Sequence, residues 1–178
     1  WFEQHYNGRA VMRTISRDFL HWDSAKFIMA ADLQDPVSTM IYSMNVFPYE
    51  GLYLGLVQRY ISQPGVGTID IQLAVSRDGI HFHRPFREPF FPLGEIGTWD
   101  RFMLHSMSGP PLLQGNELRF YYGGRPFRHR PTKVADSAPS IGYIGLATIQ
   151  QDRFVAIEAS FDGGTLITKP LRLKGSTL

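Results

Sequence analysis

The sequence predicts an all-β protein that forms part of a β-propeller, and three observations lead to this prediction. Glycine (17 residues) and proline (12 residues) interrupt the whole chain, and no long stretch shows helical periodicity. Residues 69–75 alternate with a period of two, as a half-buried strand does. A Ser-Arg-Asp string that leads to an aromatic residue occurs twice, beginning at Ser16 and at Ser76. A turn repeated in this way is typical of one small β unit used more than once.

Apolar runs bounded by turn residues predict the other strands. In chain order, single strands are expected at residues 9–15, 39–47, 52–61 and 165–173. Two hairpins are expected, one from residues 103–113 with 117–122 and one from residues 141–149 with 153–159. The polar and basic segment 125–140 is expected to be a long loop.

The repeated string is expected to close turns between strands. Short side chains that accept backbone N–H groups stabilise such turns. We therefore predict a structural role for Asp18 and Asp78, with the aromatic residues Trp22 and Phe82 packed against the core.

Composition places the chain among folded globular proteins and narrows its partners. Its 178 residues are 43% hydrophobic and 13% aromatic, enough for one domain with a core. A net charge of +2 argues against nucleic acid as a main partner. No apolar run approaches the roughly 20 residues of a membrane span. Cysteine is absent, and His81 and His83 lack a third ligand at suggestive spacing, so neither a metal site nor a cofactor is expected.

The repeat also sets the size of the expected assembly. A propeller needs at least four blades of four strands to close. At roughly 50 residues per blade, this chain supplies about three. Either missing upstream blades or a second chain would then be needed to complete the ring.

The repeated turns resemble those of a known superfamily. The strings at residues 16–22 and 76–82 are similar to the blade-closing turns of five-bladed β-propeller glycosidases, the superfamily of glycoside hydrolase families 32, 43 and 68. Residues 115–124 resemble its late-blade hairpin, and residues 144–166 resemble the exit from its last blade. The resemblance implies an incomplete ring over residues 1–160, and an exit strand or the start of a C-terminal β-sandwich over residues 161–178. It also implies a glycan or oligosaccharide ligand and a secreted or periplasmic protein.

The catalytic motifs of family 32 are not present as such. The sequence has neither N-D-P-N-G nor R-D-P, and Gln34-Asp35-Pro36 is the nearest string to the latter. Residues 48–53 occupy roughly the place of the family's E-C-P stretch, where Glu50 matches the glutamate. The resemblance thus implies Glu50 as the acid/base, with any nucleophile upstream of Trp1.

The residues themselves suggest a carboxyl pair. Glu50 lies between Tyr49 and Tyr53, and partial desolvation there would raise its pKa towards that of a working acid. Glycoside hydrolysis needs two carboxyl groups about 5 to 9.5 Å apart, and Asp100 is the best second candidate. The alternatives stay open that Glu50 is a loop carboxylate and that Asp100 pairs with Arg101 at the surface.

Five further residues are candidates for substrate binding. The imidazole of His105 could bind a sugar hydroxyl, and Arg125 opens a basic cluster at residues 125–133 that could attract an anionic sugar. The candidate stacking platforms are Tyr49, Trp99 and Tyr122. Each candidate also has a structural explanation, as a core residue or a solvated loop. The predicted function is a carbohydrate-active propeller, glycoside hydrolase-like, and the alternative is a non-catalytic glycan-binding or scaffolding propeller.

Overall fold

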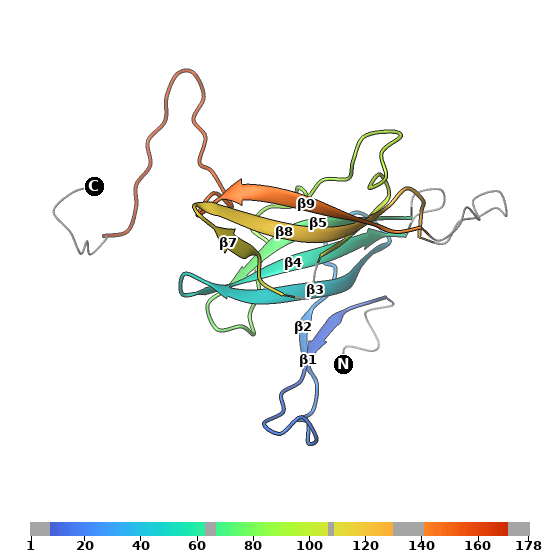
Figure 1. The fold of residues 1–178 in the computed structure, drawn as a ribbon. Coiled ribbons are helices and arrows are strands. Elements are labelled where there is room, and N and C mark those ends of the chain that lie inside the picture. The colour runs from blue at the N-terminus through green and yellow to red at the C-terminus, as the bar shows by residue number, and fades with distance from the viewer. Residues whose placement is uncertain (1–7, 63–66, 107–108, 130–140, 171–178) are drawn as a thin grey trace.

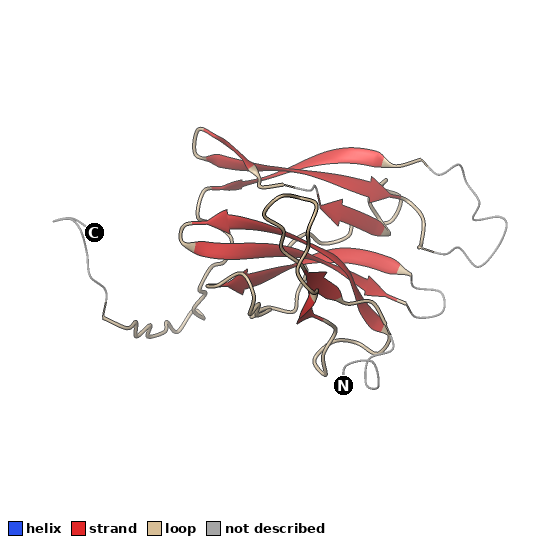
Figure 2. Cartoon of the chain, turned by 90° about the horizontal axis from the view of Figure 1, so that it is seen from below, coloured by secondary structure: helices blue, strands red, loops and turns tan. Residues whose placement is uncertain are grey.

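The computed structural model describes residues 8–62, 67–106, 109–129 and 141–170. Within these residues the chain forms strands, turns and loops and no helix (Figure 2), which confirms the all-β class for the part described. No helix in this part is therefore long and apolar enough to cross a membrane.

The described residues contain nine strands. They are β1 (Val11–Arg13), β2 (Lys26–Met29), β3 (Thr39–Tyr49), β4 (Leu52–Ile61), β5 (Thr68–Ser76), β6 (Met103–Ser106), β7 (Leu112–Gln114), β8 (Glu117–Arg125) and β9 (Tyr143–Gln150). β1 and β2 form a two-stranded antiparallel sheet. β3, β4 and β5 pair successively, and β8 pairs with β6, β7 and β9, all antiparallel.

By hydrogen bonding, β3 to β9 form one seven-stranded sheet in the order β3-β4-β5-β6-β8-β7, with β9 paired to β8. We treat this sheet as two layers, β3–β5 and β6–β9, and β1–β2 lies below β3 as a third (Figure 1). β5 meets β6 in a single parallel pair, Ile69 with Met103, so the two larger layers join at a corner. The core between these layers combines residues of β3–β5 with residues of β6 and β8: Phe47, Leu54, Leu56, Ile71, Leu73, Leu104, Leu118 and Phe120. A second core, on the side of β2, contains Met29, Ile41, Val57 and Ala74.

The middle layer is therefore buried on both faces. Leu56 and Val57 are neighbours on β4 whose side chains point to opposite faces, yet both are buried. Fully burying one such side chain contributes about 1.5–3 kcal/mol. The period-two alternation at residues 69–75 predicted a strand, and β5 confirms it. The polar residues Asp70 and Gln72 of this strand are also buried, because arginine side chains pair with them.

Both Ser-Arg-Asp turns form, with the bonding that the sequence predicts. In the second turn, Asp78 Oδ1 accepts the backbone N–H groups of Ile80 and His81 at 2.9 and 2.8 Å, and Ser76 Oγ accepts that of Gly79 at 3.0 Å. The first turn makes the same three bonds. A hydrogen bond from His81 is the largest of several effects that hold the pKa of Asp78 well below its usual range. The carboxylates of these turns therefore have a structural role, because they accept the backbone N–H groups that close the turn.

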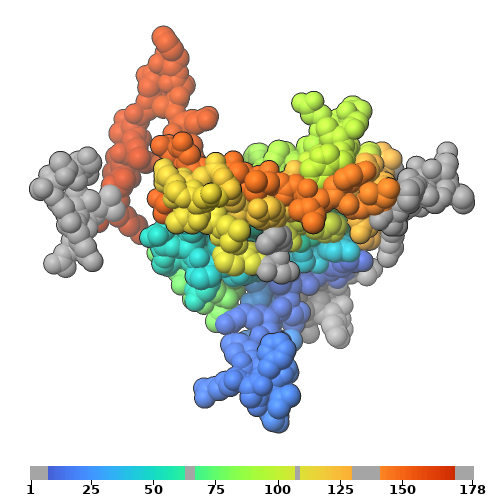
Figure 3. Space-filling model, in the orientation of Figure 1, coloured from blue at the N-terminus to red at the C-terminus, as the bar shows by residue number. Residues whose placement is uncertain are grey.

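The tips of the two turns differ. Gly79 has a φ of 71° and packs against the Tyr53 ring, and Phe82 packs against the core. The equivalent Phe19 has a φ of 64° and is 81% exposed. Trp22 was expected to pack against the core, but it is 49% exposed and contacts Phe19. The first turn projects from the body (Figure 3), because the structure holds no described strand beside it that matches β4.

Three predicted strands require correction. Residues 153–159 do not form a strand, and β9 pairs with β8 instead, from Gln150 opposite Glu117 to Tyr143 opposite Gly124. β8 offers β9 a partner along its whole length, from Tyr143 to Gln150, so no hairpin with residues 153–159 is needed to pair this strand. Residues 165–170 also form no strand, and 171–173 lie outside the described residues.

The third correction concerns the strand expected at residues 103–113. The structure divides it into β6 and β7. Pro110 and Pro111 lie between them, and proline cannot donate to a strand ladder. β2 was not predicted, and β8 extends to Arg125, where the loop was expected to begin. The rest of that expected loop, from residue 130 to 140, lies outside the described residues.

Candidate functional site

The structure places the predicted site residues in three groups. The groups are Tyr49 with Glu50 at the β3–β4 turn, Trp99 with Asp100 and Tyr122 where a loop covers β8, and His105 with Arg125 where β6 meets the end of β8.

Glu50 occupies a tight turn. Its φ is 44° and that of Gly51 is 76°, as in the two-residue turns that join β-hairpins. The side chain is exposed and lines an open pocket of about 400 Å³ together with Tyr53 and Arg77. Glu50 is therefore not enclosed by its tyrosine neighbours in the way that the sequence suggested.

Tyr49 has a partner of its own beyond the turn. Its hydroxyl donates to Asp152 Oδ1 at 2.6 Å and accepts the backbone N–H of Asp152 at 3.1 Å, while its ring packs on Phe154. Burial and the bond to Asp152 raise the pKa of Tyr49. This tyrosine fastens the segment after β9 to the β3–β4 turn.

Asp100 fastens a loop onto β8. The Tyr122 hydroxyl donates to its Oδ2 at 2.9 Å, and the Thr98 hydroxyl donates to its Oδ1 at 2.8 Å. Burial and the neighbouring Asp100 raise the pKa of Tyr122 to about 12, so the phenol remains a donor. Arg101 donates to the Gly94 carbonyl rather than to Asp100.

Trp99 belongs to the same loop and packs against β8. Its ring stacks on Tyr122, with centroids 5.5 Å apart. A Cβ at Gly124 or Gly145 would approach the Trp99 ring to 2.4 or 2.5 Å, so both glycines make room for the indole. Trp99, Asp100 and Tyr122 thus form one packed unit.

Glu50 lies next to the first residue of β4, whereas β6, the strand that follows Asp100, lies near the other end of β4. Glu50 lies beside Leu52, whereas Ile69 pairs with both Tyr60 and Met103 at the other end. The eight steps from Leu52 to Tyr60 span about 26 Å at 3.3 Å per residue. The structure does not bring the two predicted catalytic carboxylates into one group, and their roles stay a prediction.

His105 lies in a different setting. Its Nδ1 is 2.9 Å from Oε1 of the buried Gln58, and Gln58 Nε2 donates to Ser106 Oγ at 3.3 Å. Because an amide oxygen only accepts, we assign the proton to Nδ1, which leaves Nε2 with a lone pair. Burial, followed by the charges of Arg125 and His129, lowers the pKa of His105. The imidazole is therefore neutral at pH 7.

Aromatic rings surround this histidine. The Tyr42 ring lies 6.0 Å from that of His105 and 5.3 Å from that of His129, and Tyr60 lies 4.8 Å from His129. We call Tyr42, Gln58, Tyr60, His105 and His129 the His105 cluster. A neutral imidazole held by an amide and flanked by tyrosines can accept a hydroxyl hydrogen bond and offer an apolar face beside it.

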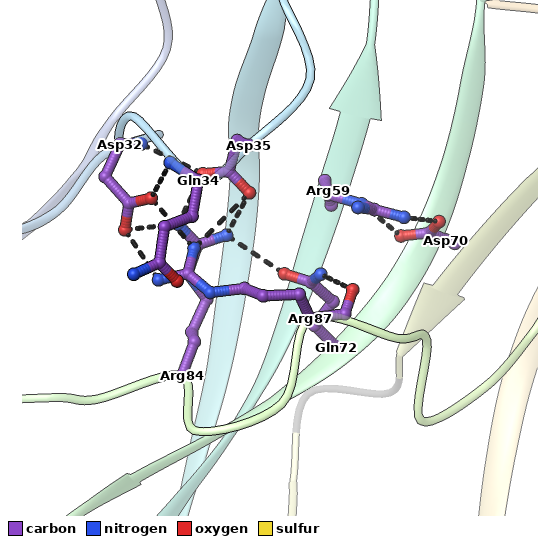
Figure 4. Close-up of polar contacts among 8 residues, drawn as sticks. All are labelled: Asp32, Gln34, Asp35, Arg59, Asp70, Gln72, Arg84 and Arg87. Carbon is purple, nitrogen blue, oxygen red and sulfur yellow. Dashed lines mark hydrogen bonds and ion pairs between the residues drawn. The ribbon is translucent and has the colours of Figure 1, made fainter.

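Sequence reasoning missed a network of buried ions (Figure 4). The side chain of Arg84 is 2% exposed and donates to Asp35, Asp32 and Gln72. Arg59 makes a two-pronged contact with Asp70, at 3.0 and 2.5 Å. The polar residues within the apolar run at 69–75 were the available signal in the sequence.

Each carboxylate of this network forms an ion pair with an arginine of the network. Burial acts to raise the pKa of Asp32, but hydrogen bonds from Arg87 and Gln34 and the two arginine charges outweigh it and lower that pKa. The string around Asp35 was the nearest match to a catalytic motif, and in the structure Asp35 is the buried partner of Arg84. Among the described residues, no group of three histidine or acidic side chains is arranged to hold a metal ion.

No model of a known protein family matches the sequence, and no curated protein matches it either. Its fold matches that of several solved structures. An N-acetylgalactosamine deacetylase from F. plautii, in complex with blood group B trisaccharide, matches with a TM-score of 0.55 and 15% identity. The match covers 79% of this chain and 41% of the deacetylase.

The second match is a glycoside hydrolase, with a TM-score of 0.50 and 14% identity over 82% of this chain and 38% of that protein. At such identities the likeness concerns the fold. The chain thus spans about two fifths of each of these proteins, and over some four fifths of its own length it shares a fold with part of two proteins of carbohydrate chemistry.

Proposed function

We propose that the protein is a glycan-binding member of a β-propeller architecture and that it contacts its glycan at the His105 cluster. The observation that carries this proposal is the neutral His105, whose Nδ1 is engaged by Gln58 and whose Nε2 remains available as an acceptor. Sugar hydroxyls are donors, and the adjoining tyrosine rings suit the apolar face of a pyranose. Both fold neighbours are proteins of carbohydrate chemistry.

The three layers support the propeller arrangement. Each Ser-Arg-Asp turn returns to the strand before it in the same register, since Asp23 N donates to Ile15 O and His83 N donates to Val75 O, both at 2.9 Å. We infer that β1–β2, β3–β5 and β6–β9 correspond to three successive blades. Further blades or a second chain would complete the ring, and residues 161–178 would lead out of it.

In this arrangement β3 and β6 are the inner strands. Two contacts join the layers beside these strands: Asn45 Nδ2 of β3 donates to the Gly109 carbonyl beyond β6 at 2.8 Å, and Gln58 of β4 bonds His105 of β6. Polar side chains from neighbouring layers thus gather at inner edges, where a propeller binds its ligands.

The binding role can be tested with a matched pair of variants. His105→Asn keeps a donor near Gln58 and removes the Nε2 acceptor, whereas His105→Gln restores an oxygen close to Nε2. We expect the asparagine variant to lose at least tenfold in affinity on a glycan array and in affinity electrophoresis, and the glutamine variant to lose less. His83→Ala is the control, since His83 is exposed. Equal affinity of all three variants would contradict the assignment.

Glycan hydrolysis is the second candidate function, supported by the glycoside hydrolase among the fold neighbours. It would use Glu50 as acid/base and Asp100 as its assistant. If so, Glu50→Gln abolishes release of reducing sugar, while Glu88→Gln, at an exposed site, leaves it unchanged. The separate locations of the two carboxylates, and the two hydroxyl groups bound to Asp100, favour binding without turnover.

A further inference from the structure

We propose that the glycan is acidic and that Arg101, Arg125 and Arg128 bind the carboxylates of its uronic acid units beside the His105 cluster. This inference rests on the proposed function and names the class of glycan.

These three arginines have no acidic partner among the described residues, whereas Arg59, Arg84 and Arg87 each pair with an aspartate. The carboxylate closest in sequence, Asp100, accepts hydroxyl groups from Thr98 and Tyr122 instead.

Two of the three side chains meet where β6 begins, and Arg125 is joined to the same place through its backbone. The Arg128 guanidinium carbon lies 4.7 Å from the centre of the Phe102 ring, and that of Arg101 lies 5.7 Å from it. Phe102 N donates to the Arg125 carbonyl at 3.2 Å, and the charge of Arg125 acts on His105. The two guanidinium charges near the Phe102 ring repel each other, and an anion bound between them would offset that repulsion.

The group is held in position. His129 N donates to the Gly67 carbonyl at 2.8 Å, which fixes the backbone next to Arg128. A guanidinium that lies over an aromatic face keeps its in-plane N–H donors directed to the side. Those donors match a carboxylate in the two-pronged geometry that arginine favours.

The arginine donors and the His105 acceptor together indicate the class of ligand. Arginine donors would bind the carboxylate, while His105 Nε2 accepts from a hydroxyl group of the same or the next sugar. A uronic acid unit carries both groups on one ring. Nucleic acid would offer phosphates to the same arginines, but the net charge of +2 provides little of the broad positive field that nucleic acid binding requires.

The test compares polygalacturonate with a neutral galactan of equal length, using the whole 178-residue chain and affinity electrophoresis or calorimetry at low salt. We expect at least a tenfold preference for polygalacturonate. Arg125→Gln combined with Arg128→Gln should lower the affinity for polygalacturonate at least tenfold and leave that for the galactan unchanged. The matched control, Arg17→Gln with Arg153→Gln, removes the same charge at exposed positions and should change neither affinity more than twofold.

Each outcome separates the inference from the function on which it rests. Equal binding of the neutral and acidic polymers would overturn the acidic class while leaving glycan binding intact. The same holds if the double variant retains its affinity for polygalacturonate. Binding of neither polymer, nor of any array glycan, would overturn both proposals. Competition by single-stranded DNA as strong as by polygalacturonate would reveal nonspecific polyanion binding and would also overturn the inference.

Discussion

Two sets of arginines differ in their partners: those of one set form ion pairs with aspartates, and those of the other form none with a described residue. The side chains of Arg59 and Arg84 are largely buried and are matched by Asp70 and Asp35. Arg125 and Arg128 lie near the start of β6 without an acidic partner among the described residues. Burial explains the difference, because a charge removed from water needs a counter-charge within the protein, whereas an exposed one does not.

The largest expected effect is the removal of Asp35. Its side chain is 1% exposed and that of Arg84 is 2% exposed, so Asp35→Ala leaves a buried positive charge without its main partner. We expect a loss of about 3–5 kcal/mol in the free energy of unfolding, measured by urea titration. Asp35→Leu combined with Arg84→Met should recover part of that loss. The control is Asp23→Ala, at an exposed position, and a similar loss there would contradict the argument.

Asp70→Asn should have a smaller effect at the other end of the network. The amide keeps the shape and one acceptor for Arg59, but it no longer balances the guanidinium charge. We expect a loss of about 2–3 kcal/mol by the same titration, since hydrogen bonds to charged groups contribute about 1.5–3 kcal/mol. No measurable loss would mean that solvent reaches Arg59.

The titration of the His105 imidazole tests whether the unpaired Arg125 lies near it. Its pKa is lowered in the folded chain, so the unfolded chain binds more protons at low pH. The contribution to stability is complete above the ordinary value of 6.5 and decreases as the pH falls through and below it. Arg125→Gln should move the NMR titration of His105 upward, because one cause of the shift is removed. An unchanged titration would place Arg125 away from His105.

The smallest effect on stability is expected from the arginines proposed to bind the ligand. Arg125→Gln with Arg128→Gln should change the free energy of unfolding by no more than about 0.5 kcal/mol, as exposed substitutions usually do. Thermal and urea unfolding of this variant and of the Arg17→Gln, Arg153→Gln control provide the measurement. A loss near that of Asp35→Ala would show that the two sets of arginines do not differ as described.

The sequence predicted local structure well and pairings between distant segments poorly. The strand at residues 52–61 and both Ser-Arg-Asp turns depend on neighbouring residues, and the structure confirms them. The partner of β9 was predicted wrongly, because a strand with apolar residues can pair with any suitable edge.

At the candidate site, too, single residues could be predicted from the sequence, but their distant partners could not. His105 could be singled out as a candidate, but Gln58, which orients it, lies 47 residues away in the sequence. The partner of Arg84 in the buried network lies 49 residues away. Asp70 and Gln72 carried a signal as polar residues within an apolar run, but no local pattern indicated which side chains would compensate them.

The Ser-Arg-Asp turns have a practical consequence for protein engineering. Each turn is closed by its own serine and aspartate, so the residues at its outermost point carry none of the closing side chains. Phe19 and Leu20 take part in these bonds only through their backbone N–H groups, and both side chains face solvent, so a fluorophore could be attached at either side chain. A side chain at Gly79 would instead lie against the Tyr53 ring, so the two turns, alike in their bonds, are unequal as attachment points.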